Sequence, residues 1–375
     1  MGAKKVIIVG GGVIGLSIAH HLLSRGVQPI VVERGAFAKE ASWAGAGYLD
    51  LRAAAQVGGA YFDLCRFSFD LFPQWVARIE KESGLATELV ESGSLDLAYD
   101  DKDEDGIRSL EKKLNEKGFA GRWLASDKAR ELEPGLSAKV QSAFYLKETR
   151  QIRPPRLTRA LLASLQKQGA VLRELEMVQS FLAKGRVIRG VKTNKETLEA
   201  DAVVLASGAW TGLWGEKFKR VIPVKPIRGQ VLLFQRPPGF LKHILFSSLA
   251  YLVPRLDGRI YVGSTLEEVG FDKSTTSLGL ERLKRGAQRA LPELENVLMD
   301  DSWAGLRPGS PDGWPFLGKL PDWEGVWLAA GHFTHGLLLS AATGQLIAQD
   351  LLGEKPTIEL SPFALGRRPH ASVGL

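Results

Sequence analysis

Residues 5–33 read KVIIVGGGVIGLSIAHHLLSRGVQPIVVE and decide the fold of this chain. The apolar run at 5–9 is typical of a strand that is buried on both faces. A glycine-rich turn at 10–15 follows it, and apolar side chains then recur with the spacing of a helix. A second apolar run, 29–32, ends at Glu33. The stretch therefore predicts a strand–helix–strand unit with two parallel strands.

The small and acidic residues of this unit each have a role in binding a dinucleotide. Gly10 permits the tight turn after the strand, and Gly12 lets the backbone approach a pyrophosphate. Gly15 allows the helix to pack closely on the strand, while free N–H groups at the helix N-terminus attract the anion. Glu33 stands where an acidic residue accepts hydrogen bonds from a ribose hydroxyl. Because all these features occur in order, the stretch predicts a dinucleotide site.

The composition is that of a globular protein with more than this one unit. The chain has 375 residues, of which 45% are hydrophobic and 24% charged. At about 100–200 residues per domain, this length predicts roughly two to three domains. The single cysteine, Cys65, excludes an internal disulfide. The net charge of +7 comes from basic residues scattered along the chain, which favours small anionic substrates rather than nucleic acid.

The sequence also bears on location and assembly. No apolar stretch reaches about 18 residues, the length that would cross a bilayer. We therefore expect a cytoplasmic protein without stable membrane insertion. A homo-oligomer is compatible with the sequence, which does not decide the oligomeric state. The numbers of cysteines and histidines speak against a structural zinc module, and His332 and His335 have no acidic or thiol partner nearby in the sequence, so we expect no metal.

The choice between FAD and NAD depends on the residues that follow Glu33. Residues 41–48 read ASWAGAGY, which is a run of small side chains. A backbone that packs along an extended ribityl and flavin moiety needs small residues, so this run favours FAD. An ordinary flexible loop has the same composition and is the alternative interpretation.

Four separated motifs together point to one family. They are the opening unit with its 42–48 loop, AVVLASGAW at 202–210, GLRPGSPDG at 305–313, and AAGHFTHG at 329–336 before an apolar helix. In this combination and order, the sequence resembles the FAD-dependent D-amino acid oxidase family, in its glycine oxidase and sarcosine oxidase branch. The resemblance covers nearly the whole chain.

The resemblance implies an α/β and α+β fold, in which a Rossmann-like FAD-binding domain is intertwined with an antiparallel-sheet substrate domain. The discontinuous FAD-binding domain would comprise residues 1–85, 150–220 and 305–365. The substrate-binding domain would comprise residues 86–149 and 221–304, with a tail at 366–375. Strand-like runs at 230–235, 249–255 and 259–264, the last two joined by a hairpin turn, support the substrate domain independently.

The resemblance also implies which residues bind FAD. The glycine turn with Glu33 would hold the ADP half, the 41–48 loop the ribityl and flavin portions, Val178 the adenine, and residues 332–338 the flavin pyrimidine edge. The full set is Gly10, Gly12, Val13, Ile14, Gly15, Glu33, Arg34, Ala41, Ser42, Ala46, Gly47, Tyr48, Val178, Gly208, Trp210, His332, Phe333, Thr334, His335, Gly336, Leu337 and Leu338.

Four residues would shape the substrate site. A carboxylate calls for a guanidinium, whose planar fork makes two parallel charge-assisted bonds, and the resemblance assigns this role to Arg307. It also assigns a hydrogen bond to the carboxylate to Tyr251, for which packing in a core is the alternative. Thr334 and Tyr48 depart from the family pattern, because similar glycine oxidases usually carry arginine and methionine there. These departures put glycine itself in doubt as the substrate.

The implied reaction is the FAD-dependent oxidative deamination of a small amino acid: glycine, sarcosine or a small D-amino acid. Hydride transfer from Cα to flavin N5 would give an imine, then an oxo acid, ammonia or an amine, and H2O2. No catalytic base is required, because the lone pair of a neutral amine forms the imine. FAD would be held non-covalently, since no cysteine late in the chain matches the attachment site of sarcosine oxidases.

The metabolic role has two alternatives. Resemblance to glycine oxidases suggests thiazole synthesis for thiamine. The alternative is a subunit of an amino acid dehydrogenase, of the proline or cyanide-forming glycine type, that passes electrons to an acceptor other than oxygen. A non-catalytic flavoprotein and an NAD-dependent enzyme are weaker alternatives.

Overall fold

The opening unit is present as predicted. In the computed structural model, which describes residues 5–369, β1 (Val6–Val9) is followed by α1 (Val13–Leu23) and β2 (Pro29–Val32). The two strands pair in parallel. Alternate residues of β1 belong to two different hydrophobic cores, so the strand is buried on both faces, as its composition predicts.

These strands lie in the middle of a six-stranded sheet with the order β18-β19-β12-β1-β2-β8. All neighbours in it are parallel except β18 and β19. The further strands are β8 (Val171–Arg173), β12 (Ala202–Leu205), β18 (Phe316–Lys319) and β19 (Val326–Ala330). Strands distant in sequence therefore lie side by side, with β1 between β2 and β12.

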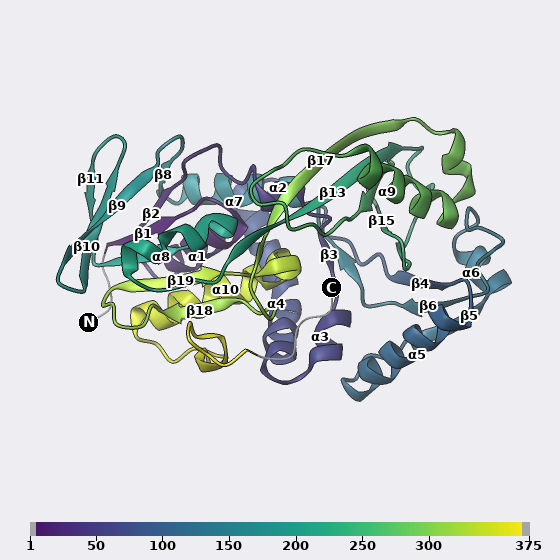
Figure 1. Ribbon diagram of the computed structural model, residues 1–375, viewed down its shortest axis with the longest axis horizontal. Helices are drawn as coiled ribbons and strands as arrows, with labels where there is room; N and C mark the ends of the chain where they lie inside the picture. Colours follow the sequence, from purple (N-terminus) through teal and green to yellow (C-terminus); the bar gives the residue numbers. More distant parts are fainter. Residues whose placement is uncertain (1–4, 370–375) are drawn as a thin grey trace.

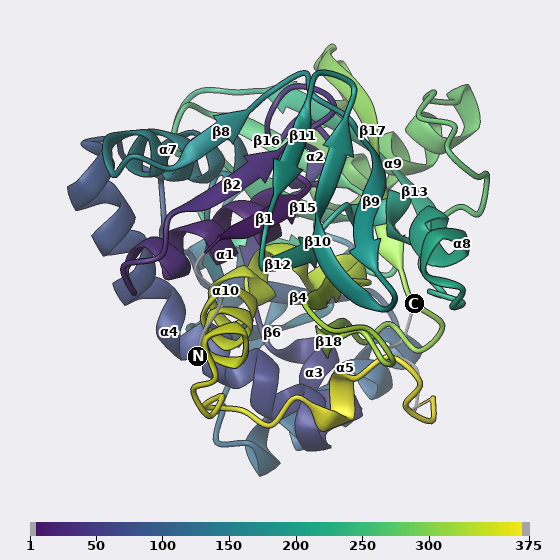
Figure 2. The same ribbon diagram turned by 90° about the vertical axis from the view of Figure 1, so that its left-hand side faces the viewer.

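Both faces of this sheet are covered. Helices form one core with it, namely α1, α4 (Gly59–Ser83), α7 (Pro154–Lys167) and α10 (Gly336–Leu352). A three-stranded antiparallel sheet covers the other face, as Figure 2 shows, and consists of β9 (Val178–Lys184), β10 (Val187–Thr193) and β11 (Thr197–Glu199). The parallel strands are thus enclosed between two layers.

A second, eight-stranded sheet has the order β17-β13-β16-β15-β14-β4-β6-β5. Its neighbours are antiparallel except β14 and β4. Its strands are β4 (Ser94–Ala98), β5 (Arg122–Ala125), β6 (Ser142–Leu146), β13 (Lys225–Gln235), β14 (Ile244–Phe246), β15 (Tyr251–Pro254), β16 (Arg259–Gly263) and β17 (Met299–Gly309). Figure 1 places the six-stranded sheet toward one end of the long axis and β4, β5 and β6 toward the other.

The three strand-like runs of the sequence are β13, β15 and β16. The predicted hairpin joins the last two: the Arg255 N–H donates to the Arg259 carbonyl at 2.8 Å, and Gly258 takes the positive φ of 86° that the turn requires. A Rossmann-like sheet combined with a largely antiparallel one confirms the predicted fold class.

The two faces of the eight-stranded sheet have different roles. Leu232 and Val262 belong to a core on one face, where α6 (Ser126–Leu132) and α9 (Ser277–Ala290) cover the sheet. The alternate residues, such as Val231 and Tyr261, belong to a small cluster on the other face. Successive side chains of a strand point to opposite faces, so this second face is the one that turns toward the candidate site.

The remaining elements are short strands, helices and turns outside the three sheets described above. They are α2 (Ala41–Ala44), β3 (Tyr48–Leu49), α3 (Arg52–Val57), α5 (Asp101–Glu116), β7 (Arg150–Gln151), α8 (Gly215–Phe218) and short 3₁₀ turns at Gly208–Trp214, Pro292–Asn296, Phe333–His335 and Ser361–Phe363. Within residues 5–369, no helix has both the length and the apolar character needed to span a membrane.

The domain boundaries stay a prediction. β17 extends across the expected boundary between residues 304 and 305. In the expected tail, the Arg367 guanidinium is held by Asp312 at 2.8 Å, whereas residues 370–375 lie outside the described part of the chain.

Folding stability is expected to fall in mild acid because of His21 in α1. Burial, followed by the charges of His20, Arg25 and Arg78, lowers the pKa of His21 to about 3. In the unfolded chain this imidazole takes up a proton near pH 6.5. The unfolded state therefore binds more protons between about pH 6.5 and 3, and stability drops by up to about 1.4 kcal/mol per pH unit as the pH falls through this window. In the variant His21→Leu, thermal melting at pH 7 and pH 5 should show a smaller loss than in the wild type; an equal loss would contradict this account.

Candidate active site

The turn between β1 and α1 builds one end of the site. Gly10 has a φ of 116°, and a Cβ at this position would collide with the Ala206 carbonyl at the end of β12. Gly12 is the N-cap residue of α1, and the next N–H, that of Val13, donates to the Ser42 hydroxyl at 2.9 Å. The backbone at the N-terminus of α1 therefore borders this end of the site. An anion binds favourably at such a helix N-terminus.

The Glu33 carboxylate lies beside this turn, at the carboxyl end of β2. It accepts from the Gly11 N–H and the Gly35 N–H, each at 2.8 Å. Two backbone donors fix its orientation, and each carboxylate oxygen keeps a further lone pair. Glu33 can therefore accept hydrogen bonds from ribose hydroxyls, as the sequence predicts.

One cavity of about 690 Å³ begins at this turn and extends to the eight-stranded sheet. It collects residues from all parts of the chain that carry the sequence motifs. The predicted cofactor residues that line it are Gly10, Gly12, Val13, Ile14, Glu33, Arg34, Ala41, Ser42, Ala46, Gly47, Tyr48, Val178, Gly208, Trp210, His332, Phe333, Thr334, His335, Gly336, Leu337 and Leu338. Gly15 is the predicted residue outside this lining set: a Cβ there would collide with the Gly10 carbonyl, so Gly15 serves the packing of α1.

Stacked side chains border the cavity near Glu33. The Arg34 guanidinium lies 3.8 Å from the ring centre of Trp210, and Trp210 stacks on Phe271 with ring centres 5.3 Å apart. Cation–π contact keeps Arg34 and its charge at the cavity wall. A side chain from the loop after β16 thus reaches residues that the sequence assigns to cofactor binding.

The start of α10 forms another wall. Burial lowers the pKa of His332 to about 3, and burial also lowers the pKa of His335, with Asp50 opposing. Both imidazoles are therefore neutral at physiological pH. His335 Nδ1 lies 2.9 Å from the Tyr61 hydroxyl, which fixes the ring. The first turn of α10 lines the cavity at Gly336, Leu337 and Leu338, and the N-terminus of a helix favours a negatively charged group nearby.

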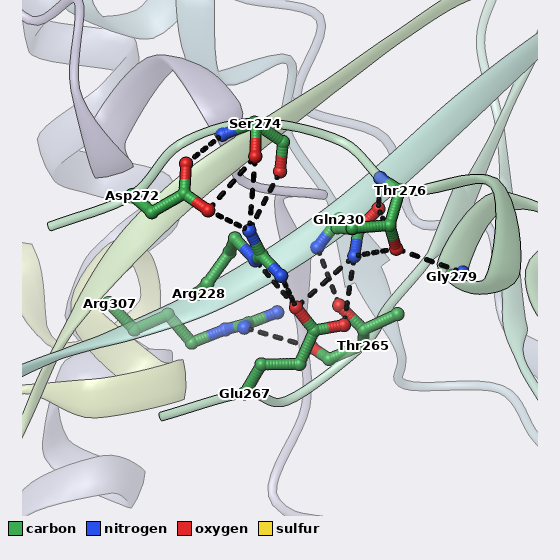
Figure 3. Close-up of polar contacts among 9 residues, drawn as sticks. All are labelled: Arg228, Gln230, Thr265, Glu267, Asp272, Ser274, Thr276, Gly279 and Arg307. Carbon is green, nitrogen blue, oxygen red and sulfur yellow. Dashed lines mark hydrogen bonds and ion pairs between the residues drawn. The ribbon is translucent and has the colours of Figure 1, made fainter. Parts of the chain in front are cut away.

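Arg307 lies on β17 and brings a guanidinium to the other end of the cavity. Its Nη2 donates to the Ser264 hydroxyl at 2.6 Å and its Nη1 to the Thr265 carbonyl at 3.2 Å; Figure 3 shows how the latter residue is held in turn. Gly229 on the paired strand β13 leaves room for it, because a Cβ there would collide with the guanidinium. The described partners of Arg307 are neutral, so its charge remains available to an anion.

Aromatic side chains surround this end of the cavity. The Tyr48 ring centre lies 5.0 Å from that of Tyr251 and 5.3 Å from that of Phe246. Burial raises the pKa of Tyr48, with Tyr251 and Asp50 adding to it and Arg307 and Arg52 opposing. The Tyr48 hydroxyl is therefore protonated and able to donate. Tyr48, Tyr251 and Arg307 are thus brought together at one end of the cavity.

Sequence reasoning missed an ion cluster in the cavity wall. Arg52 Nη1 donates to Asp50 at 2.8 Å, and its Nε donates to Asp96 at 3.2 Å. The same guanidinium lies 3.9 Å from the ring centre of Phe246. Because two carboxylates offset its charge, Arg52 is not a second free cation for a substrate. Asp50 and Arg52 are two residues apart in the sequence, but Asp96 comes from β4, so no local signal could have revealed the complete cluster.

The two departures from the family pattern also face the cavity. Thr334 is exposed there, and its hydroxyl lies 3.1 Å from His335 Nδ1.

Cys65 is buried in α4, and the described residues that line the cavity include no cysteine. Non-covalent binding of FAD stays a prediction.

The residues present fit a flavin dinucleotide. Gly10 and Gly12 leave a backbone cradle at the N-terminus of α1, and Glu33 is held ready for a ribose. The cavity continues past the small residues of the 41–48 loop to the first turn of α10, where N–H groups suit the anionic edge of a flavin. Its far end is lined by Tyr251 and Arg307, which belong to a different sheet from the cradle.

Comparisons with known proteins agree with this geometry. The family model described as FAD dependent oxidoreductase matches residues 5–350. The glycine oxidase of Pseudomonas aeruginosa is 37% identical over 96% of this chain and 98% of its own length. The bifunctional protein ThiO/ThiG of Trichormus variabilis is 34% identical over 97% of this chain, which spans 55% of that protein. The crystal structure of glycine oxidase from Geobacillus kaustophilus superimposes on this chain with a TM-score of 0.93 at 30% sequence identity. The superposition covers 98% of this chain and 99% of that chain. The chain therefore belongs to the DAO family of FAD-dependent oxidoreductases, as its motifs predict, and FAD is its cofactor.

Proposed function

We propose that this enzyme oxidises the Cα–N bond of a small amino acid, with glycine, sarcosine and small D-amino acids as the substrate class and oxygen as the acceptor. The observation that carries the proposal is the Arg307 guanidinium, which reaches the cavity with neutral partners beside the tyrosines. Similarity to the glycine oxidases supports the substrate class.

Arg307 binds the substrate carboxylate through two parallel hydrogen bonds. Tyr251 donates a further hydrogen bond, and the protonated hydroxyl of Tyr48 is a second donor nearby. These contacts fix the carboxylate, and the aromatic wall keeps water away from Cα. Held by the glycine turn and Glu33, FAD would supply the acceptor for the hydride that leaves Cα. The amine lone pair then forms the C=N bond of an imine, which water converts to an oxo acid and ammonia, or to an oxo acid and an amine where the substrate is N-methylated.

The electron balance closes with oxygen. The substrate loses two electrons and two protons as the imine forms, and oxygen takes up the same number to become H2O2. His332 and His335 are neutral and hydrogen-bonded within the protein, so neither is assigned a proton-transfer role. The neutral form of the substrate amine makes such a group unnecessary.

An anaerobic screen tests the proposal. The holoenzyme is mixed with glycine, sarcosine, proline and both enantiomers of common amino acids, and loss of the flavin absorbance is recorded. We expect bleaching by a small amino acid and recovery of colour with H2O2 when air is admitted. Recovery with a dye but not with air would replace the oxidase with the dehydrogenase alternative. A flavin that no amino acid bleaches would overturn the proposal.

The exposed hydroxyl of Thr334 lies where a longer side chain would enter the cavity. We expect Thr334→Arg to add a second cation for the carboxylate and to lower the KM of glycine relative to that of larger amino acids, by about tenfold for one added charge-assisted bond. Steady-state kinetics on glycine and D-alanine measure this ratio. Thr334→Gln, which adds length without charge, is the control; an unchanged ratio would remove position 334 from the substrate site.

The thiamine role, the cytoplasmic location and the oligomeric state stay predictions. Similarity to the bifunctional protein ThiO/ThiG supports the thiamine role. Measuring thiazole formation with the purified partner enzymes tests that role.

A further inference from the structure

The loop between β16 and α9, residues 264–276, forms part of the cavity wall and holds Arg307. Ser264, Thr265 and Leu266 line the cavity. The first two supply both described acceptors of the Arg307 guanidinium, at 2.6 Å and 3.2 Å. The direction in which Arg307 points therefore depends on where this loop lies.

Gln230 of β13 fastens the start of this loop. It is fully buried, and its backbone N–H donates to the Thr265 hydroxyl at 2.9 Å. Its side-chain nitrogen donates to Glu267 at 2.8 Å and to the Thr276 hydroxyl at 3.0 Å. Its side-chain oxygen accepts from the Thr276 N–H at 2.7 Å. One amide thus ties together both ends of the loop, as Figure 3 shows.

Arg228, two residues earlier on the same strand, fastens the middle of the loop. Its Nε donates to Glu267 at 2.5 Å, and its Nη1 donates to Asp272 at 2.6 Å and to the Ser274 carbonyl at 3.1 Å. Its backbone also pairs with that of Glu267 in both directions. Several hydrogen bonds and ion pairs from one buried guanidinium thus hold the middle of the loop against β13.

The site of Gln230 is built around its amide. Gly279, in the first turn of α9, leaves the space for it, because a Cβ there would lie 2.5 Å from the Gln230 side-chain nitrogen. The Thr276 hydroxyl that contacts Gln230 also caps α9 by accepting from the Gly279 N–H at 3.2 Å. Neither Gln230 nor Arg228 is among the described residues that line the cavity, so any effect they have on a ligand passes through the loop.

We infer that Gln230 is a positioning residue for substrate recognition, which acts through Glu267, Thr276 and the loop to orient the Arg307 guanidinium toward the substrate carboxylate. The inference rests on the proposed role of Arg307. Removing the amide releases Thr276 at the end of the loop and takes one donor from Glu267 near its start, so the guanidinium loses the geometry that two parallel bonds to a carboxylate require. The glycine turn and Glu33 lie on the other sheet and keep their own contacts, whereas the loop reaches the cofactor end through the stacking of Phe271 on Trp210 and the ion pair of Lys273 with Glu40.

The test uses the FAD-loaded enzyme and acetate, a carboxylate without an amine, whose binding is followed by the change in the visible flavin spectrum. In Gln230→Ala we expect the Kd of acetate and the KM of the amino acid to rise about tenfold or more, with kcat changed much less and FAD content unchanged. Gln235→Ala, at the exposed end of the same strand, is the matched control and should behave as the wild type.

Three further single variants and one double variant keep the test decisive. If Gln230→Ala does not fold, Glu267→Ala removes the partner shared by Gln230 and Arg228 at a partly exposed position and should weaken acetate in the same direction. Glu267→Gln retains an acceptor oxygen and should restore binding. Arg307→Met should abolish acetate binding, and adding Gln230→Ala to it should change nothing further.

The outcomes separate the inference from the proposed function. Acetate binding that is lost in Arg307→Met but unchanged in Gln230→Ala and Glu267→Ala overturns the inference and leaves the role of Arg307 intact. Acetate binding that is unchanged in Arg307→Met overturns both. A fall in kcat with no change in the Kd of acetate would also overturn the inference.

Discussion

Replacing Arg307 with alanine is expected to reduce kcat/KM for the amino acid substrate by about 30-fold to several thousand-fold. A hydrogen-bonded charge pair in a buried site loses about 2–5 kcal/mol when one partner is truncated, and about 1.4 kcal/mol corresponds to a factor of ten. Arg307 reaches the cavity, and its hydrogen-bond partners in the described structure are neutral. No carboxylate among them offsets its charge. Stopped-flow reduction of the flavin over a range of substrate concentrations measures the loss.

Graded variants show which property of Arg307 is responsible. Arg307→Lys keeps the charge but not the planar fork, so it should recover part of the activity, whereas Arg307→Met should resemble alanine. Gly229→Ala provides an independent check, because its Cβ would displace the guanidinium without removing it. Arg259→Ala removes a partly exposed arginine of β16 that pairs with Asp257 and Asp300 and should have no effect. Unchanged kinetics in Arg307→Ala would take this residue out of the substrate site.

The cofactor half of the site was predictable because its signals are local. The glycines, the helix that follows them and the acid at the end of β2 lie within one short stretch, and each has one physical role. The structure places Gly12 at the N-terminus of α1 and the Glu33 carboxylate beside the glycine turn, and their contacts with FAD stay a prediction. Even Gly15, which does not line the cavity, has the packing role that its position in the motif implies.

The orientation of the substrate half could not be read from the sequence. Arg307 is held by Ser264 and Thr265, more than forty residues away, and it fits only because Gly229 on the neighbouring strand has no side chain. Arg52 is likewise neutralised by a carboxylate on β4. These arrangements depend on which strands pair and in which register, and nothing in a single sequence fixes the register of distant strands.

Replacing Gly12 with leucine is expected to prevent FAD binding while the fold persists. Gly12 has ordinary extended backbone angles, φ −77° and ψ 177°, so a side chain causes no backbone strain there. In the protein, a Cβ at this position would meet only the Ser42 hydroxyl, at 3.2 Å. The space that the leucine side chain would fill is the cavity, where the backbone must approach the pyrophosphate closely. The steric conflict is therefore with the cofactor and not with the protein.

We expect the flavin content of purified Gly12→Leu to fall about tenfold or more, since losing the backbone contacts to the pyrophosphate weakens binding by well over about 1.4 kcal/mol. Circular dichroism should show a folded protein, with a small loss of thermal stability from the poorer N-cap. Gly106→Leu is the matched control, because Gly106 lies in α5 with open space around it, and this variant should keep its full flavin content. A yellow, fully occupied Gly12→Leu enzyme would show that the dinucleotide does not bind at the turn after β1. The assignment of this cavity as the FAD site would then be wrong.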